Sequence, residues 1–325
     1  MILCEQYDAV SGEIITVSQE QLATSLHEPN AIFWVDVQHP SDEDFTWLTE
    51  TFNFHPLAIE DARKQKQRAK VDRYENHYFL ALHAIHYYPH SHRVGVLEIG
   101  LFLGKNFIVT VHQKPIPSIT DVRKRWEQLK LPGEATPFLF YLIIDAVVDS
   151  YFPAVDLIGN QIDEVDTTIF EKMDQSSLRT IFELRRSLLT IRKLLTPLRD
   201  ALNELIRAEE GGFLFTAAYT RTYLGDVFDH VLRLTDFVDT YRDMLAGSLE
   251  AYQSSQANNL NTNMQRLTVA AIILATSTVL TGFYGMNLQG LMINSPWPYG
   301  GHLILGILVV VTLIELWIFR RIRWI

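Results

Sequence analysis

One face of an apolar segment near the C-terminus carries small and polar side chains at helical spacing. The intervals are three and four residues, and the members are Asn261, Met264, Leu267 or Thr268, Ala271, Ala275, Thr278 and Gly282. This spacing places these residues, the 261–282 stripe, on one side of a helix. Such a face suits a helix that lines an ion pore, and it equally suits close packing between membrane helices. The stripe alone leaves both interpretations open.

Two stretches are long and apolar enough to cross a bilayer. Residues 267–286 contain 20 positions without a charged side chain, and residues 302–319 contain 18 positions with Glu315 as the one charge. At about 1.5 Å per residue, the first stretch matches the roughly 30 Å of a bilayer's hydrocarbon core. Two buried helices of a large soluble core are the competing interpretation. Two spans cannot enclose a water path, so conduction would require a ring of several identical chains.

The flanking charges predict the orientation of the two spans. Arginines bracket the pair at positions 266, 320, 321 and 323, whereas the connecting loop at 288–301 contains no Lys or Arg. By the positive-inside rule, both ends of the pair lie in the cytoplasm and the loop lies outside. The membrane domain is therefore predicted at 266–325, with a basic cytosolic tail at 320–325.

The composition separates a charged part from an apolar part. The chain has 325 residues, a formal net charge of -10 and 48% hydrophobic residues, and nearly all of its charged side chains precede Leu267. This pattern excludes a purely soluble enzyme, and the acidic balance argues against nucleic acid as a partner. The single cysteine, Cys4, excludes an intrachain disulfide and a cysteine-based zinc site within one chain. The first residues lack the pattern of a secretory signal, so the N-terminal part is expected in the cytosol.

Residues 1–135 are predicted to form a cytosolic α/β domain with a mixed sheet. Strand-like runs cover 31–37, 77–88 and 94–112, and Gly-Lys-Asn at 104–106 divides the last run as a hairpin would. Helical patterns cover 41–52 and 118–130. The first of these begins with Ser-Asp-Glu-Asp, which supplies an N-cap and an acidic first turn.

Residues 136–265 are predicted to form a stalk or funnel of long helices. The patterns cover 138–172, 176–210 and a third helix that starts at 217 and runs unbroken to about Gly285. The first helix carries acidic residues at 156, 163, 164, 166 and 171, and the second carries basic residues at 179, 185, 186, 192, 193 and 199. We expect these two faces to pair in an antiparallel hairpin.

Six motifs carry a resemblance to a known family. They are Gln-Ile-Asp-Glu-Val-Asp at 161–166, Leu-Leu-Thr-Pro-Leu-Arg-Asp at 194–200, Gly-Asp-Val-Phe-Asp-His at 225–230, Val-Asp-Thr-Tyr-Arg-Asp at 238–243, Asn-Thr-Asn-Met-Gln-Arg-Leu-Thr at 261–268 and Tyr-Gly-Met-Asn at 284–287. Their order, together with a terminal pair of spans and a basic end, resembles the CorA-type magnesium transporter family. The resemblance implies a homopentamer in which the first span lines the pore, the second packs outside it and the soluble parts form a cytosolic funnel.

The resemblance also implies a function and its site residues. The function is uptake of Mg²⁺ across the inner (plasma) membrane, with Co²⁺ and Ni²⁺ as further substrates. The membrane potential would drive uptake, and cytosolic divalent ions, chiefly Mg²⁺, would gate it. The implied selectivity filter is Gly285, Met286 and Asn287. Pore-lining residues are expected at Asn261, Met264, Leu267, Ala271, Ala275 and Thr278, with a hydrophobic gate at Met264 and Leu267.

A regulatory metal site is implied at Asp226, with Asp229 or Glu250 assisting from the same helix. Other positions depart from the family pattern. The outer loop has Leu-Met-Ile-Asn at 291–294 and therefore no acid, and Thr276 replaces a common proline. We expect the unusual Glu315 to pair with Arg320 or Arg321 near the cytosolic surface.

Zinc is an alternative substrate within the same superfamily. The loop lacks an acid, and four histidines, His83, His86, His90 and His92, fall within ten residues. In a strand His83 and His86 point to opposite faces, so one shared Zn²⁺ site would require a bend.

A membrane-anchored regulatory scaffold that conducts nothing is a further interpretation. An enzyme is not expected, because no catalytic spacing such as His-Glu-x-x-His is present. The predicted partners are copies of this chain, the lipid bilayer and divalent cations.

Overall fold

The computed structural model describes residues 1–8, 12–28, 31–128, 135–171, 175–207, 218–286 and 300–324. The chain divides into two compact units, Met1–Ser248 and Leu249–Ile325. The division falls inside the helix α8 (Ala218–Gly285), so this helix contributes to both units.

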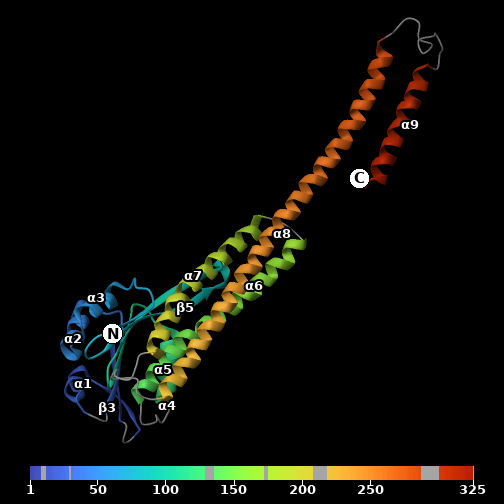
Figure 1. Ribbon diagram of the computed structural model, residues 1–325. Helices are drawn as coiled ribbons and strands as arrows, with labels where there is room; N and C mark the ends of the chain where they lie inside the picture. Colours follow the sequence, from blue (N-terminus) through green and yellow to red (C-terminus); the bar gives the residue numbers. More distant parts are fainter. Residues whose placement is uncertain are drawn as a thin grey trace. The chain divides into compact units, whose positions relative to one another are not determined.

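A seven-stranded mixed sheet forms the centre of the N-terminal unit (Figure 1). Its strands are β1 (Ile2–Asp8), β2 (Ile14–Val17), β3 (Ala31–Gln38), β4 (Lys70–Arg73), β5 (Tyr78–Tyr88), β6 (Arg93–Leu103) and β7 (Phe107–His112). They lie in the order β2-β1-β3-β7-β6-β5-β4, and β3 pairs with β7 in parallel while the other neighbours are antiparallel. The predicted mixed sheet and the hairpin at 104–106 are confirmed.

Both faces of the central strands are buried, which explains their nearly continuous apolar sequences. In β5, Phe79 and Ala81 belong to the core formed with α2 (Asp42–Phe52) and α3 (Pro56–Lys64). Leu80 and Leu82 are equally buried, and successive side chains of a strand point to opposite faces. The helices α5 (Ala135–Asp149) and α6 (Tyr151–Glu171) contact β5 and cover this second face (Figure 1).

The shorter helices follow their sequence signals closely. Ser41 caps α2 through a capping box with Asp44, as the predicted N-cap requires. The remaining short elements are α1 (Gln19–Ser25), α4 (Pro117–Gln128) and the 3₁₀ turn η1 (Pro89–Ser91). The helix predicted at 118–130 corresponds to α4 in its described part.

The helix predicted at 138–172 is wrong as a single element, because the chain breaks it at Ser150 into α5 and α6. The Ser150 hydroxyl donates to the carbonyl of Val147 at 2.6 Å and closes the end of α5. Pro153 in the first turn of α6 has no N–H for the carbonyl of Asp149, and its ring would collide with that carbonyl in a continuous helix. The chain therefore forms two helices here instead of one.

Three long helices follow, namely α7 (Gln175–Arg207), α8 and α9 (Gly300–Arg321). The prediction that one helix runs to about Gly285 is confirmed, since α8 contains 68 residues without a break. The predicted pairing of the basic face of α7 with α6 is wrong for two arginines. Arg192 Nε lies 3.2 Å from Asp239 Oδ1 on α8, and Arg199 pairs with its neighbour Asp200 at 3.0 Å.

A buried ionic network joins β1, β3, β7 and α4. Asp36 accepts hydrogen bonds from Thr110 Oγ1 at 2.6 Å, His112 Nε2 at 2.9 Å and Arg123 at 2.7 Å, and Arg123 Nε also donates to Glu5 at 3.1 Å. Burial alone would raise the pKa of Asp36, but these partners lower it below its ordinary value. The Asp36 carboxylate therefore ties β3 to both β7 and α4.

His77 is a second buried titratable group. Its ring stacks on Tyr74 with centroids 4.9 Å apart, and Nδ1 lies 2.6 Å from the side-chain oxygen of Asn76. Burial, followed by the charge of nearby His55, lowers the pKa of His77 to about 4. His77 is therefore neutral in the folded protein at physiological pH.

Candidate metal-ion sites

The 261–282 stripe lies on the exposed side of α8 in the C-terminal unit. Met264 is 63% exposed and Leu267 is 72% exposed, and Asn261, Ala271, Ala275 and Thr278 are exposed as well. Nothing in the described part of this unit covers these side chains. The stripe is therefore free to face a lumen or another copy of the chain.

The opposite side of α8 is the more buried one. Its partly or fully buried positions are Gln265, Val269, Ile273, Thr276, Ser277 and Leu280. At about 100° per residue, the mean direction of this set differs from that of the 261–282 stripe by roughly 160°. Because α9 and the residues just after it are the other described elements of the unit, we infer that this side of α8 faces α9.

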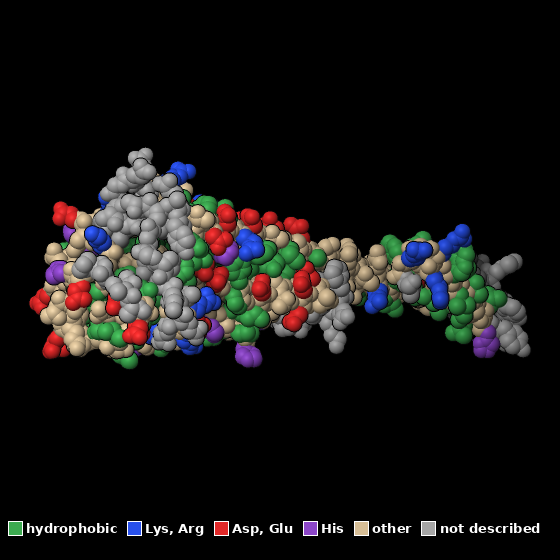
Figure 2. Space-filling model, turned by 90° about the horizontal axis from the view of Figure 1, so that it is seen from below, with side chains coloured by type: hydrophobic (Ala, Val, Ile, Leu, Met, Phe, Trp, Pro, Cys, Tyr) green, Lys and Arg blue, Asp and Glu red, His purple; other side chains and the backbone are tan. Residues whose placement is uncertain are grey.

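Two apolar helical segments of the C-terminal unit leave their side chains uncovered. Three helical segments among the described residues are long and apolar enough to cross a membrane, namely Thr136–Thr167, Thr222–Phe283 and His302–Arg321. In the most apolar 18-residue stretch of each segment, the buried share is 61%, 6% and 6%, respectively. The first is thus largely covered by protein within the N-terminal unit. Figure 2 shows hydrophobic side chains exposed on the C-terminal helices. Apolar surface of this extent requires a lipid bilayer or a protein partner around it.

The Gly-Met-Asn motif falls at the C-terminus of α8. Gly285 is the last helical residue, and the amide of Met286 donates to the carbonyl of Phe283 at 3.4 Å. The Met286 side chain is 62% exposed. Asn287 lies outside the described residues, as do positions 288–299 of the predicted outer loop.

Three side chains of the N-terminal unit form a group that could hold a metal ion. Asp145 and Asp149 lie one turn apart on α5, and His230 comes from α8. One ligand atom from each lies within 4.8 Å of the others, and His230 Nδ1 is 4.0 Å from Asp145 and 3.7 Å from Asp149. Metal–ligand bonds of about 2.0–2.6 Å place ligands roughly 3–5 Å apart, so the spacing fits one cation. We call these three residues the Asp145 cluster.

The electrostatics of the Asp145 cluster favour a bound cation. Burial first, and then the charges of Asp149 and Asp226, raise the pKa of Asp145 to about 6, against an opposing contribution from His230. His230 Nδ1 is buried and has no hydrogen-bond partner among the described residues. A divalent cation would neutralise the crowded carboxylates and give this nitrogen a ligand bond.

Asp226 adjoins the Asp145 cluster, with its carboxylate oxygen 4.0 Å from His230 Nε2. The other two predicted regulatory acids, Asp229 and Glu250, are exposed on α8 and are not part of the cluster. Sequence analysis missed Asp145, Asp149 and His230. Their signal was present, because Asp145 with Asp149 and Asp226 with His230 each have the four-residue spacing that places two ligands on one helix face.

The four histidines at 83–92 do not converge. His83 is buried and lies 3.9 Å from Glu98, and burial lowers its pKa. His86 packs edge-on against Tyr88, whereas His92 Nδ1 lies 2.8 Å from Gln161 Oε1. No metal-binding group containing these histidines occurs within the described parts of the chain. The histidine argument for zinc therefore loses its structural basis.

The predicted pairing of Glu315 with Arg320 or Arg321 is wrong. The guanidinium of Arg321 instead lies over the ring of Trp317, 5.4 Å from its centroid. The Oε2 atom of Glu315 is buried and has no hydrogen-bond partner in the described structure. The geometry of α9 explains this, because residues five or six apart on a helix point to different sides.

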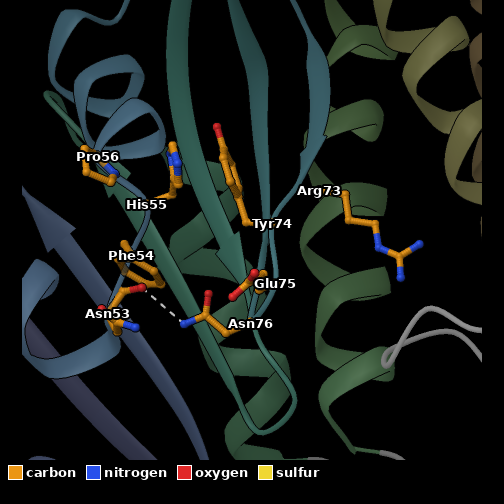
Figure 3. A pocket seen from close by; sticks show the side chains of 8 residues that line it. All are labelled: Asn53, Phe54, His55, Pro56, Arg73, Tyr74, Glu75 and Asn76. Carbon is orange, nitrogen blue, oxygen red and sulfur yellow. Dashed lines mark hydrogen bonds between the residues drawn. The ribbon is translucent and has the colours of Figure 1, made fainter.

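The N-terminal unit also has a surface cavity. Its volume is about 830 Å³, and its lining is Asn53, Phe54, His55, Pro56, Arg73, Tyr74, Glu75 and Asn76. Figure 3 shows the His55 ring beside the Tyr74 ring, and the two centroids are 4.5 Å apart. Asn76 donates to the carbonyls of Phe52 and Asn53, which closes one wall. The cavity shares no residue with the Asp145 cluster or the 261–282 stripe.

The C-terminal unit thus contains two apolar helical segments, in α8 and α9, that are long enough to cross a membrane. The family model described as "CorA-like Mg2+ transporter protein" matches residues 29–321. The chain therefore belongs to the CorA family of divalent cation transporters, whose members are transporters or channels and not enzymes.

Individual proteins agree with this assignment. The chain is 31% identical over 277 residues to the "Cobalt/magnesium transport protein CorA" of Thermotoga maritima, covering 85% of this chain and 78% of that protein. The structure of the CorA magnesium transporter from Methanocaldococcus jannaschii superposes with a TM-score of 0.86 at 22% identity, covering 100% of this chain and 99% of the other. The cytoplasmic domain of ZntB from Vibrio parahaemolyticus superposes with a TM-score of 0.61 at 14% identity, over 79% of this chain and 99% of that one. The last two likenesses concern the fold.

Proposed function

We propose that this chain forms a channel for divalent cations and that Mg²⁺ is its main substrate, with Co²⁺ and Ni²⁺ as further substrates. The observation that carries the proposal is the 261–282 stripe, whose side chains are exposed along one face of α8. Two spans cannot enclose a pore, so several copies must place this stripe around a common axis. A homopentamer, which the family resemblance implies, is the assembly we propose.

The proposed filter is the ring of Gly285, Met286 and Asn287 at the end of the pore helix. Mg²⁺ keeps its octahedral water shell unless near-ideal oxygen ligands replace it. Amide and backbone oxygens near a helix C-terminus can accept hydrogen bonds from those waters without removing them. A ring of carboxylates would hold the ion more tightly and release it more slowly, so neutral oxygens suit flux.

The proposed gate consists of Met264 and Leu267, the large apolar members of the stripe. Rings of such side chains can exclude water from a narrow pore and stop ions without a plug. In the proposed topology both ends of the chain are cytoplasmic, and the membrane potential drives entry. Two charges that cross about 100 mV release about 4.6 kcal/mol, so uptake requires no ATP.

The proposed sensor is the Asp145 cluster together with Asp226. Crowded carboxylates repel one another when the site is empty and attract through a bound dication, so high cytosolic Mg²⁺ would favour one closed arrangement. The imidazole of His230 adds a ligand that suits Co²⁺, Ni²⁺ or Zn²⁺ better than Mg²⁺. Asp229 and Glu250, exposed on the same helix, would assist only across a subunit contact. Asp226→Lys should alter the dependence of closure on internal Mg²⁺, and an unchanged dependence would exclude Asp226 from sensing.

Uptake by liposomes that contain the purified protein tests this function. Under an inside-negative potential, entry of Mg²⁺ should exceed that of Zn²⁺, and Co²⁺ and Ni²⁺ should also enter. Preferential entry of Zn²⁺ would establish the zinc alternative. Absence of flux for every ion in correctly assembled protein would favour a regulatory scaffold.

A further inference from the structure

His230 lies between carboxylates on both edges of its ring. On one edge, Nδ1 is 4.0 Å from Asp145 Oδ1 and 3.7 Å from Asp149 Oδ1, both on α5. On the other edge, Nε2 is 4.0 Å from Asp226 Oδ1, one turn earlier on α8. All three distances exceed the roughly 2.7–3.2 Å of a hydrogen bond. The ring therefore has two acidic sides without a direct bond to any of these acids.

The two edges of the ring differ in burial. The side chain of Asp145 is 12% exposed, and His230 Nδ1 is buried without a hydrogen-bond partner among the described residues. Asp226 is 59% exposed, and it does not belong to the group of ligand atoms that lie within 4.8 Å of one another. An ion held by Asp145, Asp149 and Nδ1 would therefore have Asp226 behind its histidine ligand and not among its ligands.

No Lys or Arg side chain forms an ion pair with these three carboxylates in the described part of the chain. Arg233 instead lies over the ring of Phe152, with its guanidinium 5.2 Å from the centroid. Phe152 packs nearly perpendicular to the His230 ring, with the two centroids 5.6 Å apart. This contact supports the imidazole from the side and leaves the carboxylates to an external cation.

The chemistry of imidazole connects Asp226 to metal binding at Nδ1. A neutral imidazole carries one proton, so Nδ1 offers its lone pair to a metal only when the proton is on Nε2. A carboxylate that faces Nε2 stabilises this tautomer, because it accepts a hydrogen bond from the Nε2–H. A movement of about 1 Å by the exposed Asp226 side chain would shorten the 4.0 Å separation to such a bond.

The donor atoms of the Asp145 cluster indicate the class of cation. The cluster combines one imidazole nitrogen with two carboxylates. Nitrogen ligands suit Co²⁺, Ni²⁺ and Zn²⁺, whereas Mg²⁺ prefers an octahedral set of oxygens and loses its water reluctantly. The preference for one class over the other therefore depends on whether His230 presents its Nδ1 lone pair to the ion.

We propose that Asp226 orients His230 by holding the proton on Nε2, and that the Asp145 cluster binds Co²⁺, Ni²⁺ or Zn²⁺ more tightly than Mg²⁺. Asp145, Asp149 and His230 Nδ1 are the ligands, and Asp226 is a positioning residue. The consequence for transport rests on the proposed channel and its sensor, because these ions would favour the closed arrangement at lower concentrations than Mg²⁺. Metal binding itself does not depend on transport.

Titration of the purified, metal-free, full-length protein with Co²⁺ tests the site without transport. The visible absorption of bound Co²⁺ reports its ligands, and added Mg²⁺ measures the competition. Mg²⁺ should displace Co²⁺ from the wild type only in large excess. His230→Asp supplies oxygen ligands alone and should lose this preference, and its difference from the wild type isolates the Asp145 cluster from other Co²⁺ sites. If His230→Asp does not fold, His230→Gln takes its place.

Replacement of Asp226 tests the positioning role. Asp226→Asn should weaken Co²⁺ binding by about 10- to 100-fold, the usual effect of removing a carboxylate behind a metal-bound histidine. Mg²⁺ binding should change less, whereas a simple effect of charge would weaken both divalent ions equally. Asp226→Glu should retain most of the Co²⁺ affinity. The matched control is Asp236→Asn, which removes the same charge from an exposed position of α8 outside the cluster and should leave Co²⁺ binding unchanged.

A double variant separates orientation from charge. In the His230→Asp background, Asp226→Asn should change the Co²⁺ affinity by less than about threefold, because no imidazole remains to be oriented. The same loss as in the wild-type background, or equal losses of Co²⁺ and Mg²⁺ affinity in Asp226→Asn, would refute the positioning role. Equal Co²⁺ affinity of the wild type and His230→Asp would refute the site. Co²⁺ binding as predicted, with no flux of any ion into liposomes, would refute the channel and retain the metal site.

Discussion

Replacing Asp149 by Asn should stabilise the metal-free protein and weaken its stabilisation by divalent cations. The carboxylates of Asp145 and Asp149 offer oxygen atoms within 4.8 Å of each other, and at an effective dielectric constant of about 20 this repulsion is about 3.5 kcal/mol. The Asp149 side chain is 46% exposed, so solvent screening reduces the expected gain in unfolding free energy to about 1 kcal/mol. The gain applies above about pH 6, where the Asp145 carboxyl, whose pKa is raised to about 6, is ionised.

The metal-bound protein should respond in the opposite direction. An ion at about 100 times its Kd stabilises a protein by about 2.7 kcal/mol. Loss of one ligand, taken as an affinity loss on the order of 100-fold, leaves about 0.4 kcal/mol of that stabilisation. The two opposite effects of one substitution distinguish a metal site from an ordinary pair of surface acids.

Thermal unfolding of the purified full-length protein, with and without Mg²⁺ or Co²⁺, measures both effects. The control is Asp156→Asn, which removes the same charge from an exposed position on α6 outside the cluster. The control should retain the full metal-induced increase in Tm. An equal increase in the wild type and Asp149→Asn would show that the Asp145 cluster holds no ion.

Shortening Met264 and Leu267 to Ala should raise the leak of the closed channel in planar bilayers, and an unchanged leak would remove the gate from this position. Acidification should destabilise the fold through His77, because the unfolded chain binds a proton near pH 6.5 and the native ring binds one only near pH 4. The stability present above pH 6.5 falls by about 3 kcal/mol as the pH drops through this window, and His77→Phe should reduce that loss in denaturation midpoints. Asp36→Asn should cost about 3 kcal/mol in urea unfolding, because it removes the buried carboxylate that binds both His112 and the partly buried Arg123, and a loss below about 1 kcal/mol would contradict this role of Asp36.

The sequence predicted those elements that depend on residues adjacent in the chain. The N-cap at Ser41 and the turn at 104–106 each depend on a few adjacent residues, and the structure contains both. The long helix α8 lacks a proline and changes from charged to apolar composition without a stop signal, so its length was also predictable. Helical periodicity alone was enough to place the 261–282 stripe on one face of α8, whereas its exposure required the structure.

Features that depend on distant residues were not predictable in the same way. The Asp145 cluster requires α5 to lie against α8, and no local pattern specifies that contact. The break between α5 and α6 depends on Pro153, whose effect was masked by apolar periodicity on both sides. Glu315 was assigned Arg320 or Arg321 as a partner from closeness in the sequence, although residues five or six apart on a helix point to different sides.

The most direct test of the channel is Mg²⁺ flux into liposomes that contain either the wild type or Asn287→Ala, under the same inside-negative potential. The filter proposal predicts rapid entry through the wild type, and loss of Mg²⁺ entry or of its selectivity in the variant, while both proteins retain the same oligomeric size. Wild-type rates and ion selectivity in Asn287→Ala would contradict the account.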